Sequence, residues 1–241
     1  MNDDEGDEES EDNEAPLTAA PNLAPETTIE SAANLACTTE VASALSKQLV
    51  AEINCMVPNS LVVLPQHEHV EVDSAVFPYL QPAAAKSFAA AVDAYVASKG
   101  GGADVKVKLN SALRTLPQQY MLSQWAARKR CGIAKAAKPG GSKHESGLAL
   151  DVANWSDAKK SLTDHNLTWF GRSDTVHFTF NGAGATDIKS QSVKAFQRLW
   201  NKNHPQDRLP ENGQYGPDTE KRVKGSPVGG FAKGAECAVS P

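Results

Sequence analysis

One stretch of this sequence decides how the centre of the chain folds: Ser142-Lys143-His144-Glu145-Ser146-Gly147-Leu148-Ala149-Leu150-Asp151. Residues 147–153 are apolar apart from Asp151, which is typical of a buried strand, and a glycine- and proline-rich loop precedes them. His144 therefore lies where the loop leads into the strand, and Asp151 lies on the strand itself. Residues 175–180 predict another strand, which carries His177.

His144, Asp151 and His177 have the composition of a metal site. Two imidazoles and one carboxylate form a common zinc-ligand set, and three protein ligands leave a fourth position for water, as in catalytic sites. A zinc ion lowers the pKa of such a water toward about 7. Asp174 precedes His177 by three residues, so we expect its carboxylate to act as the general base beside that water.

The spacing of these residues resembles that of a known family. Ser142-x-His144-x-x-Gly147-x-Ala149-x-Asp151, followed by Asp174-x-x-His177-Phe178, is similar to the motifs of the zinc D-alanyl-D-alanine carboxypeptidases and of the related L-alanyl-D-glutamate endopeptidases. The resemblance covers roughly residues 60–181. It implies bound Zn²⁺ and hydrolysis of a peptide bond in the stem peptides of bacterial peptidoglycan.

The resemblance also extends upstream of the metal ligands. Ser111-Ala112-Leu113-Arg114-Thr115, with Gln118 after it, resembles the segment in which the family places an arginine toward its substrate. This implies that Arg114 binds the substrate carbonyl or carboxylate, which a guanidinium can do through two parallel hydrogen bonds. We expect Gln118, Ser142 and Trp169 to complete the substrate site, with Trp169 as a wall of the pocket.

Asp174 leaves the cleaved bond open, because some members of the family have glutamate at this position. A D-Ala-D-Ala carboxypeptidase is the first hypothesis, and an endopeptidase acting on L-Ala-D-Glu or on a cross-link is the second. A third, of another class, is a non-catalytic protein that binds zinc or the cell wall, since the hedgehog signalling domain has a similar metal scaffold. Asp174 and Arg114 favour an enzyme, because a purely structural zinc ion needs neither.

A second histidine pair, His67-x-His69, lies close to Glu68 and Glu71. On a strand the two histidines would share a face, as metal ligands must. No third ligand is evident from the sequence, so we interpret this region as a solvated strand.

The whole pattern predicts an α+β fold, with a small antiparallel sheet, helices packed on one side of it and zinc on the exposed face. The peptidase domain should cover 37–184. Its expected helices are 39–54, 82–98, 115–130 and 156–166, and its expected strands are 61–64, 70–72, 105–109, 147–153 and 175–180.

Residues 185–241 form the third predicted part of the chain. The segments Ser192–Trp200 and Asn212–Thr219 resemble a small helical peptidoglycan-binding module, in which an aromatic-Gln helix is followed by an Asn-Gly turn. We therefore expect a helical mini-domain and a tail after residue 184, and peptidoglycan as a partner of both domains.

Residues 1–36 are predicted to be a disordered acidic tail, because they contain too little apolar surface to offset chain entropy. Positions 1–14 hold nine of the 29 acidic residues, so the remainder has 24 basic and 20 acidic residues. The basic residues are scattered rather than clustered with aromatics, which argues against nucleic-acid binding. The tail could tether the domain to a membrane.

The four cysteines predict two disulfides and an exported monomer in an oxidising compartment, the periplasm, the cell envelope or the medium. The first residues do not resemble a secretory signal, so we expect that an export signal has been removed. A helix over 39–54 would hold Cys37 and Cys55 about 20 Å apart. Each should therefore pair with one of the distant cysteines, Cys131 and Cys237, in an order left open.

Overall fold

The central sheet has five strands in the order β2-β4-β5-β7-β6. The computed structural model describes residues 20–237. The strands are β2 (Val70–Val72), β4 (Val107–Ser111), β5 (Ala149–Val152), β7 (His177–Phe180) and β6 (Leu167–Trp169). Their pairing is antiparallel except for the parallel pair β2 and β4. The predicted α+β class is confirmed, with one parallel edge that the sequence did not indicate.

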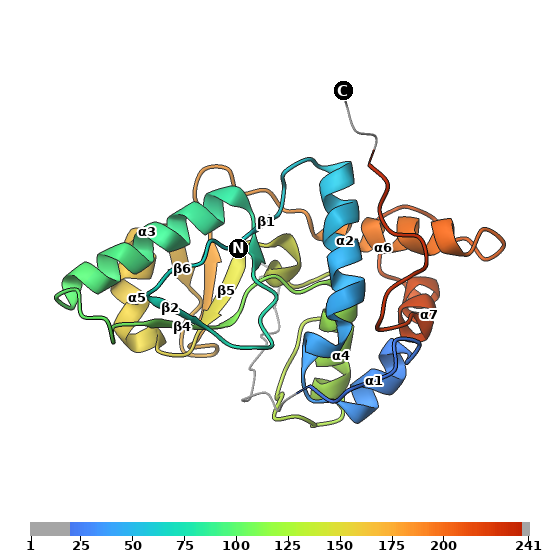
Figure 1. The fold of residues 1–241 in the computed structure, drawn as a ribbon, viewed down its shortest axis with the longest axis horizontal. Coiled ribbons are helices and arrows are strands. Elements are labelled where there is room, and N and C mark those ends of the chain that lie inside the picture. Colours follow the sequence, from blue (N-terminus) through green and yellow to red (C-terminus); the bar gives the residue numbers. More distant parts are fainter. Residues whose placement is uncertain (1–19, 238–241) are drawn as a thin grey trace, which may run out of the picture.

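Two helices cover one face of this sheet, α3 (Pro82–Ser98) and α5 (Trp155–Asp164). Figure 1 shows them side by side along the sheet. Leu150 and Phe178 lie in the hydrophobic cluster that these helices close. Because side chains alternate along a strand, Asp151 and His177 leave the opposite face. The predicted arrangement, with helices on one side and the candidate metal ligands on the other, is therefore confirmed, but these side chains are buried rather than on an exposed face.

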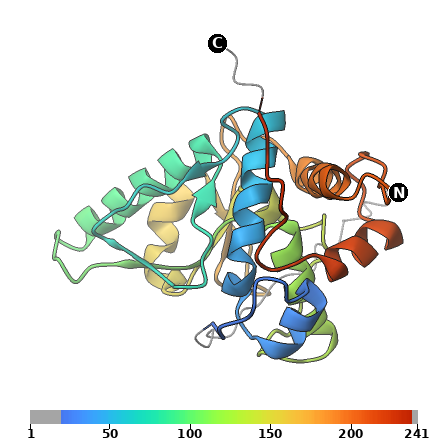
Figure 2. The ribbon, with the colours of Figure 1, turned by 45° about the vertical axis from the view of Figure 1, so that its right-hand side comes forward.

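A separate group of helices builds the second hydrophobic cluster. It contains α1 (Ile29–Leu35), α2 (Ser43–Met56), α4 (Leu116–Ala127), α6 (Lys189–Asn203) and α7 (Pro217–Gly225). The 3-10 helix η1 (Thr39–Ala42) leads into α2, and a two-stranded antiparallel sheet of β1 (Val62–Val63) and β3 (Tyr79–Leu80) follows it. Figures 1 and 2 both show α1 from the beginning of the chain next to α7 from its end.

The predicted tail boundary at residue 36 is wrong, because residues 20–36 are ordered. Thr28 caps α1, whose side chains Ile29, Ala32 and Ala33 are buried in the helical cluster. Local composition missed this helix because helices far along the chain supply the apolar surface that covers it. The rest of the predicted tail, 1–19, with its proposed membrane tether, lies outside the described residues.

The C-terminal segment also departs from the expected organisation. Phe196, Leu199 and Val223 lie in the same cluster as Ile29 and Trp125, so residues 185–231 do not have a core of their own. The motif residues nevertheless meet as the sequence indicates. Gln197 of α6 accepts the N–H of Gly213 at 2.9 Å and donates to Asn212 and Gln214, which fixes the Asn-Gly turn.

Most predicted elements are present with shifted ends. The helices at 82–98 and 115–130 begin where proline and the Thr115 cap indicated, while the strand expected at 105–109 is displaced to 107–111. The sequence missed β3 and β6, which have two and three residues and are defined by their partners rather than by their composition.

Two disulfides join distant parts of the chain. Cys37 pairs with Cys131 and Cys55 pairs with Cys237. This confirms that Cys37 and Cys55 do not pair with each other. Disulfides persist in oxidising compartments, so the two bonds fit an exported protein. In residues 20–237, no helix combines the length and the apolar character that a membrane span requires.

Candidate metal centre

Asp151 and His177 face each other across β5 and β7. Their residues are register partners, so both side chains leave the same face of the sheet. Asp151 Oδ1 lies 3.0 Å from His177 Nδ1. Ser111 of β4 is the register partner of Asp151 on its other side, so one row of polar side chains crosses three strands.

His144 reaches this row from a short 3-10 helix, η2 (Lys143–Ser146), that precedes β5. Its Nε2 lies 3.1 Å from His177 Nδ1 and 3.3 Å from Asp151 Oδ1. Its Nδ1 lies 2.6 Å from the carbonyl oxygen of Ala112. Because a carbonyl only accepts, Nδ1 carries the ring proton and Nε2 presents its lone pair to the other two side chains.

These three side chains are buried, with exposed fractions of 1% for His144, 1% for Asp151 and 8% for His177. Across the described part of the chain, they form the one group of at least three histidine, cysteine or acidic side chains whose ligand atoms converge closely enough to hold a metal ion. The ligand set predicted from the sequence therefore comes together from η2, β5 and β7.

Arg114 holds the far side of the Asp151 carboxylate. Its Nη2 donates to Asp151 Oδ2 at 2.7 Å, and its Nε donates to Ser111 Oγ at 3.1 Å. Arg114 is itself buried. The guanidinium therefore orients Asp151 so that Oδ1 faces the imidazoles, a role that the sequence did not suggest. The predicted role of Arg114 toward a substrate stays a prediction.

The environment sets the charge states of the three ligands. Burial acts to raise the pKa of Asp151, but His144, His177 and Arg114 outweigh it and hold that pKa well below its usual range. Burial, together with the charge of Arg114, lowers the pKa of His144. Burial also acts to lower the pKa of His177, but the hydrogen bond and the charge of Asp151 outweigh burial and raise that pKa. Asp151 is thus kept ionised and His144 neutral, the states that bind metal, whereas the raised pKa of His177 favours its protonated form, from which metal binding would have to displace a proton.

Asp174 lies beside the same ligand atoms. Its Oδ2 is 3.9 Å from His177 Nδ1, and its carbonyl accepts the N–H of His177 at 3.4 Å. The side chain is buried, with an exposed fraction of 3%. A carboxylate at this position can exchange a proton with a water held among the three ligands.

Two of the predicted substrate-binding residues, Ser142 and Gln118, cap helices of the scaffold. Ser142 Oγ accepts the N–H of His144 at 3.3 Å, so it caps η2. Gln118 Oε1 accepts the N–H of Thr115 at 2.9 Å, in the capping box of α4. Both side-chain oxygens thus face the backbone at the start of their own helices. The expected substrate contacts of Gln118 and Ser142 stay predictions.

Glu145 received no role from the sequence, yet it is fully buried beside His144. Its carboxylate accepts the N–H of Gly140 at 2.8 Å and that of Ser142 at 3.1 Å. It therefore ties the glycine-rich loop to the helix that carries His144. The Ser142-x-x-Glu145 capping-box pattern was the signal that could have revealed it.

Trp169 does not line the metal site as predicted. It is the register partner of Phe178, and paired residues share a face, so Trp169 lies on the core face of the sheet, stacked on Trp155 at 5.2 Å. The next residue, Phe170, points the other way. Its ring stands edge-on to His177 with centroids 5.6 Å apart, so Phe170 is the aromatic neighbour of the site.

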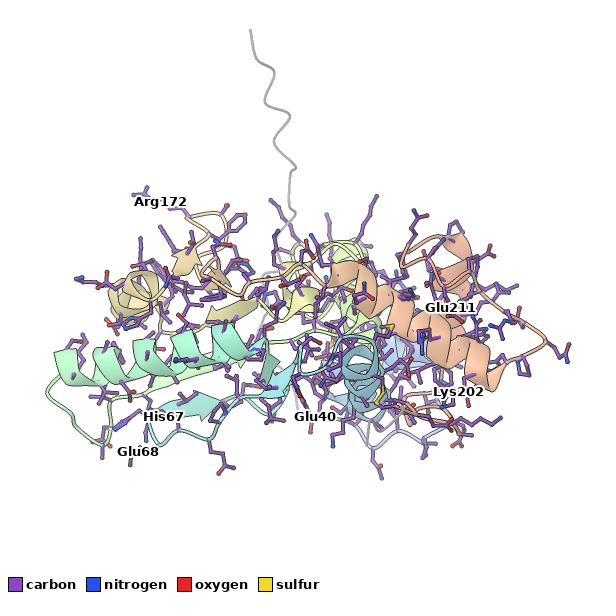
Figure 3. The ribbon with its side chains drawn as sticks, turned by 90° about the horizontal axis from the view of Figure 1, so that it is seen from above. Glu40, His67, Glu68, Arg172, Lys202 and Glu211 are labelled. Carbon is purple, nitrogen blue, oxygen red and sulfur yellow. A yellow bond between two sulfur atoms is a disulfide. The ribbon has the colours of Figure 1, made fainter. Side chains whose placement is uncertain are left out.

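His67 and His69 are not brought to this site. Figure 3 shows His67 and Glu68 beneath α3, near one end of the molecule. His67 Nε2 lies 3.1 Å from Asp93, and His67 Nδ1 accepts the N–H of His69 at 3.1 Å. His69 Nδ1 donates to the carbonyl of Val105 at 2.9 Å. The ring nitrogens thus tie a surface turn to α3 and to the start of β4.

Comparisons with known proteins do not identify a family, because no protein-family model matches the chain and no curated protein matches it significantly. The functional interpretation therefore depends on the geometry of the site and on the motif residues that build it.

Proposed function

We propose that this chain is a zinc-dependent peptidase that removes the terminal D-alanine from the stem peptides of bacterial peptidoglycan. One observation carries the proposal: His144 Nε2, Asp151 Oδ1 and His177 Nδ1 converge within 3.0 to 3.3 Å of one another, with the Asp174 carboxylate beside them. The sequence motif resembling the D-alanyl-D-alanine carboxypeptidases supplies all four of these residues.

The donor set fits zinc. Ligands at about 2.0–2.1 Å from a tetrahedral zinc ion lie about 3.3–3.4 Å from one another. The three ligand atoms here are only slightly closer together, and a buried set of two imidazoles and one carboxylate is a common zinc environment. Zinc bound there would polarise the substrate carbonyl and lower the pKa of a bound water.

The residues around the ligands supply the proton transfer. Asp174 Oδ2 accepts a proton from the attacking water as the new C–O bond forms. It then passes this proton to the amine nitrogen as the C–N bond of the peptide breaks. Arg114 keeps the Asp151 carboxylate in place through its 2.7 Å hydrogen bond, and Phe170 covers the edge of His177.

Carboxypeptidase action is proposed over endopeptidase action because the resemblance implies that Arg114 faces the substrate, where a guanidinium can bind a free terminal carboxylate. Peptidoglycan as the partner, an exported location in the cell envelope and a monomeric state belong to the same proposal. The two disulfides support the exported location.

The test is mass spectrometry of muropeptides of known structure after incubation with the zinc-loaded protein. Loss of one alanine from pentapeptides is the expected result, and Asp174→Asn with verified zinc content is the control. Cleavage between L-alanine and D-glutamate, or splitting of cross-linked dimers, would instead identify an endopeptidase. No cleavage of any muropeptide would overturn the enzymatic proposal in favour of a binding protein.

A further inference from the structure

The loop before η2 is in direct contact with the C-terminal segment. Gly140 has a φ of +84°, a conformation that side chains rarely adopt. A Cβ at Gly140 would lie 3.1 Å from Val193 Cγ2 of α6 and 3.3 Å from Tyr215 Cβ of the turn after α6. Both the conformation and the close approach favour glycine, so α6 and its turn pack closely against this loop.

The same loop is rigidly connected to the metal ligand His144. Gly140 N–H and Ser142 N–H both donate to the carboxylate of Glu145, the residue that directly follows His144. Ser142 Oγ in turn accepts the N–H of His144. A displacement of Gly140 would therefore be transmitted through two hydrogen-bonded links to the backbone of the ligand.

The other end of η2 is held by the same C-terminal segment. Ser146, which is fully buried, donates from its Oγ to Asp187 Oδ1 at 2.9 Å. The carbonyl of Ser146 accepts from Gln81 Nε2 at 2.7 Å, and Gln81 Oε1 accepts the N–H of Thr186 at 3.1 Å. Residues 186–187, which precede α6, thus secure the end of the helix that carries His144.

We propose that Tyr215 and Asp187 are positioning residues of the metal site, through which the C-terminal segment fixes His144 for metal binding. This inference rests on the proposed zinc site. A ligand held in its binding position before the metal arrives loses less conformational freedom on binding, so affinity depends on the elements that hold it. The C-terminal segment is in this view a part of the metal centre rather than an appended module.

The first experiment compares Tyr215→Ala with Tyr215→Phe in the full chain, using zinc competition against a chromophoric chelator. Tyr215→Ala keeps the Cβ that faces Gly140 but removes the half-buried ring that holds this turn against the helical cluster. The turn should then shift away from Gly140, and zinc binding should weaken about tenfold or more, as loss of a supporting contact does elsewhere. Tyr215→Phe should bind zinc like the wild type, because the Tyr215 hydroxyl is buried without a hydrogen-bond partner among the described residues.

A matched control separates positioning from general stability. Val223→Ala removes a fully buried side chain of α7 from the same hydrophobic cluster, away from η2. It should lower the thermal midpoint of the metal-free protein while leaving the zinc dissociation constant unchanged. If Tyr215→Ala behaved in the same way, with a lower midpoint and wild-type zinc affinity, the proposal would be overturned.

Substitutions of Asp187 test the same proposal independently. Asp187→Ala should weaken zinc binding, whereas Asp187→Asn should not, because asparagine keeps the side-chain oxygen that accepts from Ser146. Ser146→Ala combined with Asp187→Ala should cost no more than either change alone. Asp218→Ala, which removes an exposed carboxylate of α7 paired with Arg222, is the matched control. Additive losses in the double variant would contradict a shared hydrogen bond.

Hydrolysis and zinc binding are measured separately, so the two proposals fail separately. A wild-type protein that binds zinc but cleaves no muropeptide would overturn the peptidase and leave the positioning role supported if Tyr215→Ala still loses affinity. A wild-type protein that cleaves muropeptides, with unchanged zinc affinity in Tyr215→Ala and Asp187→Ala, would overturn only the positioning role.

Discussion

The molecule contains two pairs of histidines that differ in what their ring nitrogens face. In one pair, His144 and His177, a nitrogen of each ring points toward Asp151 and toward the other ring, at 3.0 to 3.3 Å. In the other pair, His67 and His69, the ring nitrogens are turned to backbone groups and to surface carboxylates.

The difference shows that histidine spacing alone does not define a metal site. The hydrogen bond on the second ring nitrogen makes the difference. His144 Nδ1 donates to the carbonyl oxygen of Ala112, which leaves Nε2 free to act as a ligand. His67 Nδ1 instead accepts a backbone N–H from the residue two positions later. The first pair could therefore hold a cation, whereas the second pair stabilises a surface turn.

The largest effect should come from removing a ligand of the first pair. His144→Ala should abolish stoichiometric zinc binding, and hydrolysis with it, because two remaining ligands do not complete a site. His69→Ala should retain one zinc ion per chain. Equilibrium dialysis followed by metal analysis measures both. Zinc retention by His144→Ala, or its loss in His69→Ala, would reverse the assignment of the two pairs.

The next largest effect concerns catalysis without metal loss. Asp174→Asn keeps the size of the side chain but removes its basicity, so kcat should fall about 10²- to 10⁴-fold with unchanged zinc content. Steady-state release of D-alanine measures the rate. Asp93→Asn, beside His67, changes the carboxylate of the second pair in the same way and should leave kcat as in the wild type. A normal rate in Asp174→Asn would exclude Asp174 as the base.

A smaller effect is expected from removing the guanidinium of Arg114, which is hydrogen-bonded to Asp151. Arg114→Met leaves a buried carboxylate without its guanidinium, which should cost about 3–5 kcal/mol of unfolding free energy in the metal-free protein. Zinc should recover part of this loss, because a bound cation again faces Asp151. Urea unfolding with EDTA and with zinc measures both quantities. An equal loss in the two conditions would mean that the zinc ion does not interact with Asp151.

The contrast between the two pairs also shows what the sequence could reveal. The candidate ligands His144, Asp151 and His177 were predictable from their residue types and the motif spacing. Their meeting on one face was not, because it depends on the register in which β5 pairs with β7. The face of the sheet on which Trp169 lies was not predictable, because β6 has only three residues and its register is set by the pairing of Trp169 with Phe178. Short strands carry too few residues for alternation to be read.

Long-range packing explains the remaining errors. Helix α1 was missed because its seven residues gain their burial from α4 and α7, about ninety and two hundred residues away along the chain. The role of Glu145 was missed for a different reason. Its capping-box pattern with Ser142 is visible in the sequence, but a residue that directly follows His144 points away from the candidate ligands, and the pattern alone does not show that its carboxylate also holds the loop at Gly140.

The smallest predicted effect belongs to the second pair and tests whether it is only structural. The imidazole of His67 is 23% exposed and the carboxylate of Asp93 is 73% exposed, so their interaction is largely screened by water. A double-mutant cycle of His67→Ala and Asp93→Ala should give a coupling free energy below about 1 kcal/mol. Urea unfolding with and without zinc should give the same value in both conditions, because no part of this pair approaches the metal centre. A coupling above about 2 kcal/mol, or one that changes with zinc, would show that the turn at His67 is linked to the metal site, and the separation of the two pairs would fail.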